Sequence, residues 1–130
     1  MVDDEVLRLY EELGVVLRGH FVLTSGKHSP TFLQCSMVMQ HPAHLERLCR
    51  ELAGRLGRPR VDCVAGPAMG GVLLAYEMAR ALGARAIYAE KGDGGLEFRR
   101  NFRLSRGERC IVVEDAVTTG GSASSVIELV

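Results

Sequence analysis

One segment, residues 111–122, constrains the fold more than any other part of the chain. An apolar run over 111–113 is followed directly by Glu114 and Asp115, and a loop of small and hydroxyl residues then leads to Ser122, where a helical stretch begins. A strand that passes through a short loop into a helix is typical of α/β domains. In open α/β sheets, ligands bind at the carboxyl ends of the strands. The segment therefore predicts an α/β fold with a binding site that contains both acids.

The remainder of the chain alternates between helix-like and strand-like segments. Apolar residues recur at helical spacing over 3–13, 42–56, 72–82 and from 122 onward. Short apolar runs predict strands over 19–23, 31–35, 61–65, 84–89, 98–102 and 110–113. Strands that alternate with helices favour a Rossmann-like, mostly parallel sheet flanked by helices. No linker interrupts the pattern, so we expect residues 1–130 to form a single domain.

The loop after the two acids has the composition of a phosphate-binding loop. Its glycines let backbone N–H groups close around a phosphate, and Thr118, Thr119 and Ser122 can add hydroxyl donors. Glu114 and Asp115 would repel a phosphate but suit ribose hydroxyls with a divalent cation nearby, so the pattern indicates a sugar phosphate. No Lys follows the glycines, which excludes a Walker loop. The alternative is an ordinary strand-to-helix turn capped by Ser122.

Two further glycine-rich segments predict contacts with a second anion. Segment 66–71 follows a strand and opens a helix, so its backbone donors should lie at the same sheet edge; a plain turn, with Met69 serving only in packing, is the alternative. Segment 91–95 begins at Lys91 and continues with three glycines and Asp93, which predicts a flexible lid that brings a positive charge over the anion. A solvated hairpin is its alternative. Of Arg99 and Arg100, at most one is expected to face the site.

The polar turn 24–30 between the first two strands predicts a second part of the site. Phe32 could stack on a planar base, although a core aromatic on an alternating strand is an equal alternative. Lys27 is either a ligand contact or a surface charge. His41 and His44 lack further metal ligands nearby, so we expect them at the surface or in a helix cap.

Composition excludes several classes of protein. Lys plus Arg and Asp plus Glu both number 16, and this zero net charge argues against a protein that coats nucleic acid or an acidic membrane. No stretch approaches the roughly 20 apolar residues of a membrane span, and no signal peptide is visible. The four cysteines form no CxxC pair, so we expect reduced core thiols in a cytoplasmic protein.

Residues 111–122, read as an apolar strand, two acids, two small or apolar residues and then Thr-Thr-Gly-Gly-Ser, resemble the signature of the type I phosphoribosyltransferases, which bind 5-phosphoribosyl-1-pyrophosphate (PRPP). Residues 21–32 resemble the N-terminal strand pair of the orotate phosphoribosyltransferases. The resemblance implies the type I fold with a small N-terminal hood of short strands. It also implies transfer of ribose 5-phosphate from PRPP to orotate in pyrimidine biosynthesis, giving orotidine 5′-monophosphate and pyrophosphate, with Mg²⁺ as cofactor and a homodimeric enzyme.

The resemblance further implies roles for single residues. Glu114 and Asp115 would hold the ribose hydroxyls and, with Lys91 of the lid, act in catalysis. The other PRPP contacts would be Ala116, Val117, Thr118, Thr119, Gly120, Gly121 and Ser122 at the 5′-phosphate and Ala68, Met69, Gly70 and Gly71 at the pyrophosphate. Orotate would contact Thr118, Lys27 and Phe32. No side chain would ligate Mg²⁺ directly, because PRPP would hold it.

The chain departs from the family pattern in three places. Thr24 stands where many members carry Lys, and the lid holds a single lysine, Lys91. Family chains continue for several dozen residues, so we expect residues 1–130 to be C-terminally incomplete. The alternative functions are a purine phosphoribosyltransferase, a PRPP-sensing regulator and a non-catalytic fragment; a regulator usually carries a nucleic-acid-binding element, and none is visible.

Overall fold

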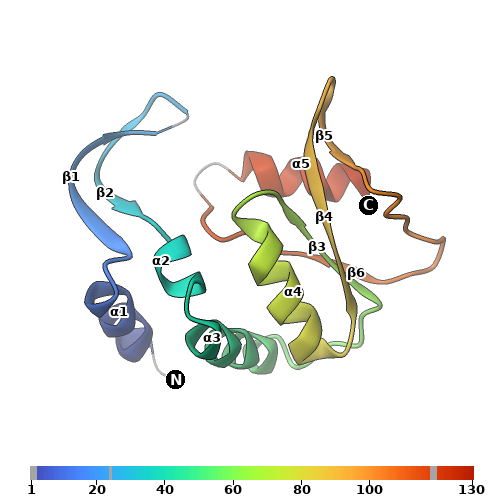
Figure 1. Cartoon of the computed structure of the whole chain (residues 1–130), viewed down its shortest axis with the longest axis horizontal. Coiled ribbons are helices and arrows are strands. Elements are labelled where there is room, and N and C mark those ends of the chain that lie inside the picture. Colours follow the sequence, from blue (N-terminus) through green and yellow to red (C-terminus); the bar gives the residue numbers. More distant parts are fainter. Residues whose placement is uncertain (1–2, 24, 118–119) are drawn as a thin grey trace.

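The computed structural model describes residues 3–23, 25–117 and 120–130. An N-terminal helix and a two-stranded hairpin stand to one side of a four-stranded sheet that is flanked by helices (Figure 1). The elements are α1 (Asp3–Glu12), β1 (Val16–Val22), β2 (His28–Leu33), α2 (Ser36–Met39), α3 (Pro42–Arg55), β3 (Cys63–Pro67), α4 (Gly71–Leu82), β4 (Arg85–Gly92), β5 (Gly95–Phe98), β6 (Cys110–Val112) and α5 (Gly121–Leu129).

The larger sheet has the strand order β5-β4-β3-β6. β3 pairs in parallel with both β4 and β6, and only β5 runs antiparallel to its neighbour. The predicted mostly parallel sheet is therefore confirmed. Because β3 and β6 point the same way, the loops that follow them leave the sheet at the same edge.

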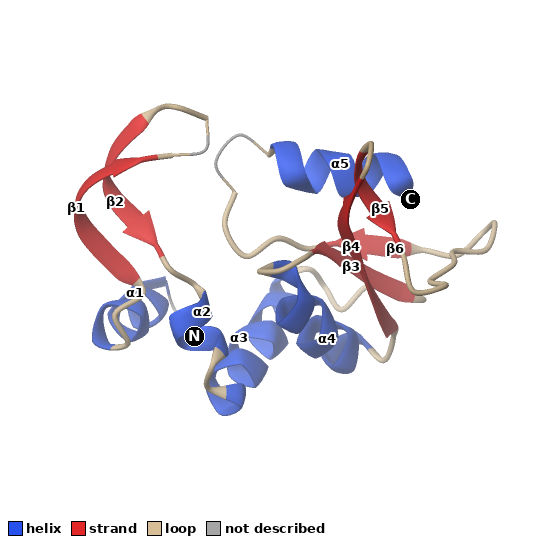
Figure 2. Ribbon diagram, turned by 45° about the horizontal axis from the view of Figure 1, so that its top comes forward, coloured by secondary structure: helices blue, strands red, loops and turns tan. Residues whose placement is uncertain are grey.

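β3 lies at the centre of the core, and all five of its residues are buried. On one face Val64 packs in a cluster that includes Cys49 of α3 and Met78 of α4. On the other face Cys63 and Ala65 pack in a cluster with Val126 of α5. Figure 2 shows α3 and α4 on one side of the sheet and α5 on the other. A strand covered on both faces has no polar side, which explains its continuous apolar run.

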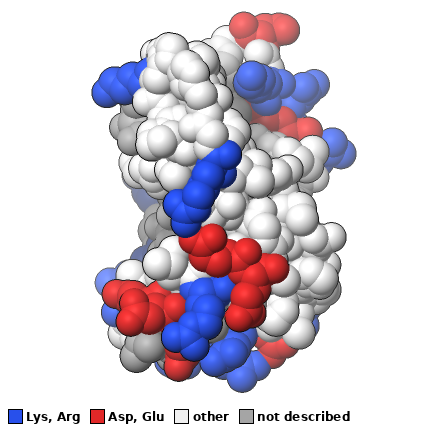
Figure 3. All heavy atoms as spheres, turned by 90° about the vertical axis from the view of Figure 1, so that its left-hand side faces the viewer, with Lys and Arg blue, Asp and Glu red and all other residues white. Residues whose placement is uncertain are grey.

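Charged side chains join α1 to α3 at the surface. Arg55 Nη1 lies 2.8 Å from Asp3 Oδ1, and Arg47 Nη2 lies 3.7 Å from Glu5 Oε2. Acidic and basic side chains lie side by side on the lower part of the face shown in Figure 3, and the upper part has an uncharged area with charged side chains around it. Within the described residues, no helix is both long enough and apolar enough to span a membrane.

Several predicted boundaries were wrong. β1 begins at Val16 and β2 at His28, three residues earlier than expected in each case. β2 starts early because His28, which was expected in the turn, pairs with Val22, and β1 starts early because Val16 pairs with Leu33 at the far end of β2. The strand expected over 98–102 lies at Gly95–Phe98 instead. The single turn of α2 was not predicted, since four residues are too few to display a helical period.

The lid segment, expected to be a flexible loop, is largely a β-hairpin. Lys91 pairs with Leu96 and Gly92 with Gly95, which leaves only residues 93–94 in the turn. Asp-Gly between two strands is a strong signal for a two-residue hairpin turn, and this signal was missed. The solvated-hairpin alternative describes the backbone better.

Candidate active site

Two of the predicted glycine-rich loops meet at the carboxyl edge of β3 and β6: segment 66–71 and the loop that begins at Glu114. The Val113 N–H donates to the Ala65 carbonyl over 2.8 Å, which holds the chain beyond β6 against β3. Asp115 then lies directly against the other loop: a Cβ placed on Gly70 would be 2.5 Å from Asp115 Oδ2. The acids of one loop and the glycines of the other therefore share one edge of the sheet.

Cys35, just before α2, bonds to the backbone of Asp115. Its Sγ donates to the Asp115 carbonyl oxygen over 3.4 Å, and the residue is buried. Burial, and then the charge of Asp115, raise the pKa of this thiol, so it stays neutral and keeps its proton as a donor. The sequence had indicated only a core thiol here, because the partner is 80 residues away along the chain.

Glu114 lies in a setting that disfavours its charge. Burial, the negative charge of Asp115 and a hydrogen bond with the Asp115 side chain raise its pKa above the ordinary 4.5. Glu114 is the one acid of the pair that lines both cavities at this edge of the sheet.

The larger of these cavities, about 600 Å³, is large enough for a small-molecule ligand. It lies among the β4–β5 hairpin, the loop after β6, the start of α5 and the β1–β2 turn. Its lining residues are Ser25, Lys91, Gly92, Gly95, Leu96, Glu114, Ala116, Val117, Gly120, Gly121, Ser122 and Ser125. Predicted residues from the lid and from the loop after β6 thus line one space, together with Ser25 of the predicted turn 24–30 and with Leu96 and Ser125, which the sequence had not singled out.

Strand alternation and a helix terminus place a lysine and the positive end of a helix dipole at this cavity, which Glu114 also lines. Lys91 follows Ile87 and Ala89 at every second position of β4, and those two side chains pack in the same cluster as Val126 of α5, so Lys91 lies on the α5 face of the sheet. Gly120, at φ 83°, turns the chain into α5. The N-terminus of a helix carries a partial positive charge and attracts anions.

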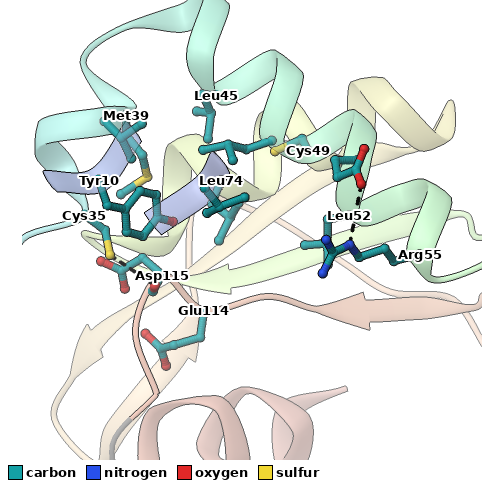
Figure 4. Close-up of a pocket in the computed structure, with 14 residues that line it drawn as sticks. Tyr10, Cys35, Met39, Leu45, Cys49, Leu52, Arg55, Leu74, Glu114 and Asp115 are labelled. Carbon is teal, nitrogen blue, oxygen red and sulfur yellow. Dashed lines mark hydrogen bonds and ion pairs between the residues drawn. The ribbon is translucent and has the colours of Figure 1, made fainter. Parts of the chain in front are cut away.

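The second cavity, about 240 Å³, lies on the other side of the acids. Figure 4 shows Glu114 and Asp115 at one end of it, with Cys35 and Tyr10 next to Asp115 and the side chains of Met39, Leu45, Leu52 and Leu74 along its walls. The walls are mostly apolar and offer few donors for a phosphate.

Other predicted site residues lie outside the larger cavity. Lys27 is exposed in the β1–β2 turn, and Phe32, 42% exposed, packs on Phe21 with ring centroids 5.7 Å apart. Met69 is 83% exposed, so the expectation that it serves in packing was wrong. Ala68, Gly70 and Gly71 lie at the adjoining loop. Thr118 and Thr119 lie outside the described residues.

The two neighbouring arginines hold the outer side of the hairpin. Arg100 Nε donates to Glu90 Oε2 over 2.8 Å, and Arg99 Nε lies 3.7 Å from Glu97 Oε1. Neither arginine lines the larger cavity. Glu90 and Glu97 are directly opposite each other in the β4–β5 register, so each arginine offsets one of two facing negative charges.

The prediction for Glu114 follows from its raised pKa. Turnover that needs the ionised acid should fall on acidification at a pH above 4.5, and a Glu114→Gln variant should be slower but lack this acidic limb. Stability should change with pH in the opposite direction to turnover. The stabilisation that the raised pKa of Glu114 provides is fully present below the ordinary pKa and is lost as pH rises through the pKa in the folded protein. Rate profiles and thermal unfolding curves of the wild type and of Glu114→Gln, measured from about pH 4 to about pH 8, would check both signs. A wild-type limb centred at or below 4.5 would contradict the prediction.

Both the sequence and the fold of this chain are similar to those of known proteins. The phosphoribosyl transferase domain family matches residues 35–130. The orotate phosphoribosyltransferase of Caldanaerobacter subterraneus is 52% identical over 130 residues, which is 100% of this chain and 68% of that protein. The crystal structure of orotate phosphoribosyltransferase from Aeropyrum pernix is 28% identical, with a TM-score of 0.75 over 95% of this chain and 72% of that one. The structure of Leishmania donovani UMP synthase superposes with a TM-score of 0.83 at 24% identity and shares the fold over 28% of its chain.

Proposed function

The chain belongs to the phosphoribosyl transferase family and, within it, to the orotate phosphoribosyltransferases, and we propose that its larger cavity binds PRPP for transfer of ribose 5-phosphate to orotate. The products are orotidine 5′-monophosphate and pyrophosphate. The observation that carries the proposal is the meeting of three groups at one sheet edge: the paired acids Glu114 and Asp115, the glycine loop that contacts Asp115, and Lys91 across the cavity.

The 5′-phosphate binds at the start of α5 in this proposal. Ala116, Val117, Gly120, Gly121 and Ser122 line that end of the cavity. Their backbone N–H groups and the Ser122 hydroxyl donate to the phosphate oxygens, and the helix N-terminus favours the negative charge. Thr118 and Thr119 of the same loop are assigned to this phosphate, and Thr118 also to orotate, from the sequence pattern alone.

The pyrophosphate binds between the other loop and the hairpin. Met69, Gly70 and Gly71 offer backbone donors on one side, and Lys91 supplies a positive charge on the other. Ala68 belongs to the same loop, but its N–H donates to the Ala89 carbonyl over 2.7 Å, so it would border the pyrophosphate without donating to it. As the bond from the anomeric carbon to the pyrophosphate oxygen breaks, negative charge moves to the leaving group, and Lys91 stabilises it there.

Glu114 and Asp115 act on the ribose. Their oxygens accept hydrogen bonds from the ring hydroxyls, and their negative field stabilises the positive charge that the sugar ring acquires in the transition state. The ring nitrogen of orotate, which is anionic when bound, attacks the anomeric carbon, so no general base is required. Phe32 and Lys27 are proposed to border the base, at the hairpin that also supplies Ser25 to the cavity.

Mg²⁺ is part of the proposal, and the donors present suit it. Hard divalent cations prefer oxygen ligands, and Glu114 and Asp115 provide carboxylate oxygens at this edge. In this proposal PRPP holds the ion, with the two carboxylates beside it and no side chain as a direct ligand. When bound, Mg²⁺ neutralises charge on the pyrophosphate.

A panel of bases tests the activity. The chain is incubated with PRPP, Mg²⁺ and orotate, adenine, guanine, hypoxanthine or uracil, and pyrophosphate release is measured. We expect release with orotate alone. Release with a purine instead would reassign the base, and PRPP binding without release from any base would favour a regulator.

Lys91 gives a prediction of its own. Removing its charge with Lys91→Ala should lower kcat/KM for PRPP by about tenfold or more, with part of the loss in kcat, since a charge-assisted contact to the leaving group is lost as its charge develops. Lys91→Arg keeps the charge and should recover most of kcat/KM. Steady-state kinetics at fixed orotate would measure both variants. Equal kcat and kcat/KM for wild type and Lys91→Ala would remove Lys91 from the site.

We also propose that the protein acts as a cytoplasmic homodimer. Leu73 and Tyr76 of α4 are more than half exposed and lie near the exposed Met69, which gives α4 an apolar outer surface suited to a second copy. Molar mass in solution, measured by light scattering, would test the dimer, and a monomer at micromolar concentration would contradict it.

A further inference from the structure

Gly70 has a backbone conformation that does not require glycine. Its φ of −61° and ψ of −29° are right-handed helical values that any residue adopts. It stands directly before α4, where Ser, Thr, Asn or Asp would add a capping hydrogen bond, yet this cap has no side-chain bond. Neither backbone strain nor helix capping therefore explains a glycine at this position.

The space around Gly70 does explain it. A Cβ at this position would lie 2.5 Å from Oδ2, 2.7 Å from Cγ and 2.8 Å from Oδ1 of Asp115, all well inside ordinary contact distance. Gly66 and Gly71 differ, because there a Cβ would meet the backbone of the same loop or the Pro67 ring. The carboxyl group of Asp115 thus rests on the bare Cα of Gly70.

The other parts of Asp115 are held from different directions. The Cys35 thiol bonds to its carbonyl oxygen, and two residues earlier the Val113 N–H bonds to Ala65. These contacts place the backbone of Asp115. Its side chain hydrogen-bonds Glu114 and lies against Gly70, at the end of the loop 68–71 that is proposed to bind pyrophosphate (the pyrophosphate loop).

We propose that Gly70 is a positioning residue for the Asp115 carboxylate, so that the conformation of the pyrophosphate loop sets where the acid meets the ribose. The inference rests on the proposed function, because it takes Asp115 as the acid that acts on PRPP. The proposal couples the two loops. A change in the pyrophosphate loop would alter catalysis by moving Asp115, an acid that belongs to the loop after β6.

A double-mutant cycle tests this coupling with four proteins: wild type, Gly70→Ala, Asp115→Ala and the double variant. Asp115→Ala removes all three atoms that a Cβ on residue 70 would meet. We expect Gly70→Ala to lower kcat at least tenfold in the wild-type background and less than twofold in the Asp115→Ala background. We also expect its fall in Tm, about 4 °C or more, to disappear when Asp115 is Ala.

A second readout separates positioning from damage to the loop itself. Binding of Mg²⁺-pyrophosphate, measured by calorimetry, should change less than twofold in Gly70→Ala, because pyrophosphate has no ribose for Asp115 to contact. Gly54→Ala is the matched control: it lies in α3 with no atom within 4 Å of an added Cβ, and should leave kcat unchanged.

The outcomes are distinct. The positioning role would be overturned if Gly70→Ala lowered kcat by the same factor in both backgrounds. It would also be overturned if Gly70→Ala weakened pyrophosphate binding as much as it lowered kcat. An active wild type with an equally active Gly70→Ala variant would overturn it as well, while leaving the proposed function intact. A wild type that releases no pyrophosphate with any base would overturn the proposed function, and the inference with it.

Discussion

Replacing Asp115 with Asn is expected to lower turnover by about 100-fold or more while changing KM for PRPP only a few fold. The amide occupies nearly the same space beside Gly70 and keeps the Cys35 bond to the backbone, so the local structure is preserved. What is lost is the negative charge, which stabilises the positive sugar ring only as the transition state forms. Steady-state kinetics with saturating orotate would measure both parameters.

The control for this variant is Asp4→Asn, the same chemical change on an exposed position of α1. It should leave kcat and KM as in the wild type. Unfolding curves of both variants would verify that the fold is intact. An Asp115→Asn protein with wild-type turnover would show that the charge of this acid takes no part in the chemistry.

The largest effect on stability is expected from Gly66→Ala. A Cβ at this position would lie 2.6 Å from the carbonyl oxygen of Gly71 and 3.1 Å from its carbonyl carbon. Both atoms belong to the backbone at the start of α4, so no side chain can rotate away, and the residue lies in the fully buried strand β3. We expect a loss of about 3 kcal/mol in the free energy of unfolding, or roughly 10 °C in Tm.

Denaturant and thermal unfolding would measure this loss, with Gly54→Ala as the matched control. Gly54 lies within α3 with open space around it, so alanine there should stabilise the protein by about 0.5–1 kcal/mol through its higher helix propensity. Glycine-to-alanine substitution should therefore lower the free energy of unfolding at position 66, through a steric clash, and raise it at position 54, through helix propensity. The comparison separates these two effects. A Gly66→Ala protein as stable as the wild type would mean that β3 and α4 can move apart at little cost.

The two glycine positions also differ in what they should do to catalysis. Gly66 lies in the strand, and its neighbour across the close approach is Gly71 of α4. Gly70 faces a carboxyl group that the proposed mechanism uses. We therefore expect Gly66→Ala to act mainly on stability and Gly70→Ala mainly on turnover, although the two lie only four positions apart in the sequence.

The sequence by itself determined the α/β class, the strand-loop-helix unit at 111–122 and the family. These features are local: an apolar run, two acids and a glycine-rich turn lie next to one another, and their chemistry can be read without knowing the rest of the fold. The same holds for α3 and α4, whose predicted and observed bounds agree within one residue, because Pro42 and Gly83 mark a helix start and a helix end.

Only the tertiary structure decided which distant residues meet. The contact of Asp115 with Gly70, the bond from Cys35 and the position of Lys91 on the α5 face all join segments 30 to 80 residues apart. The order β5-β4-β3-β6 produces these meetings, since parallel pairing brings the ends of β3 and β6 to one edge. Strand pairing and side-chain packing are long-range, so no local pattern could specify that a glycine without backbone strain is required because a carboxyl group lies against it.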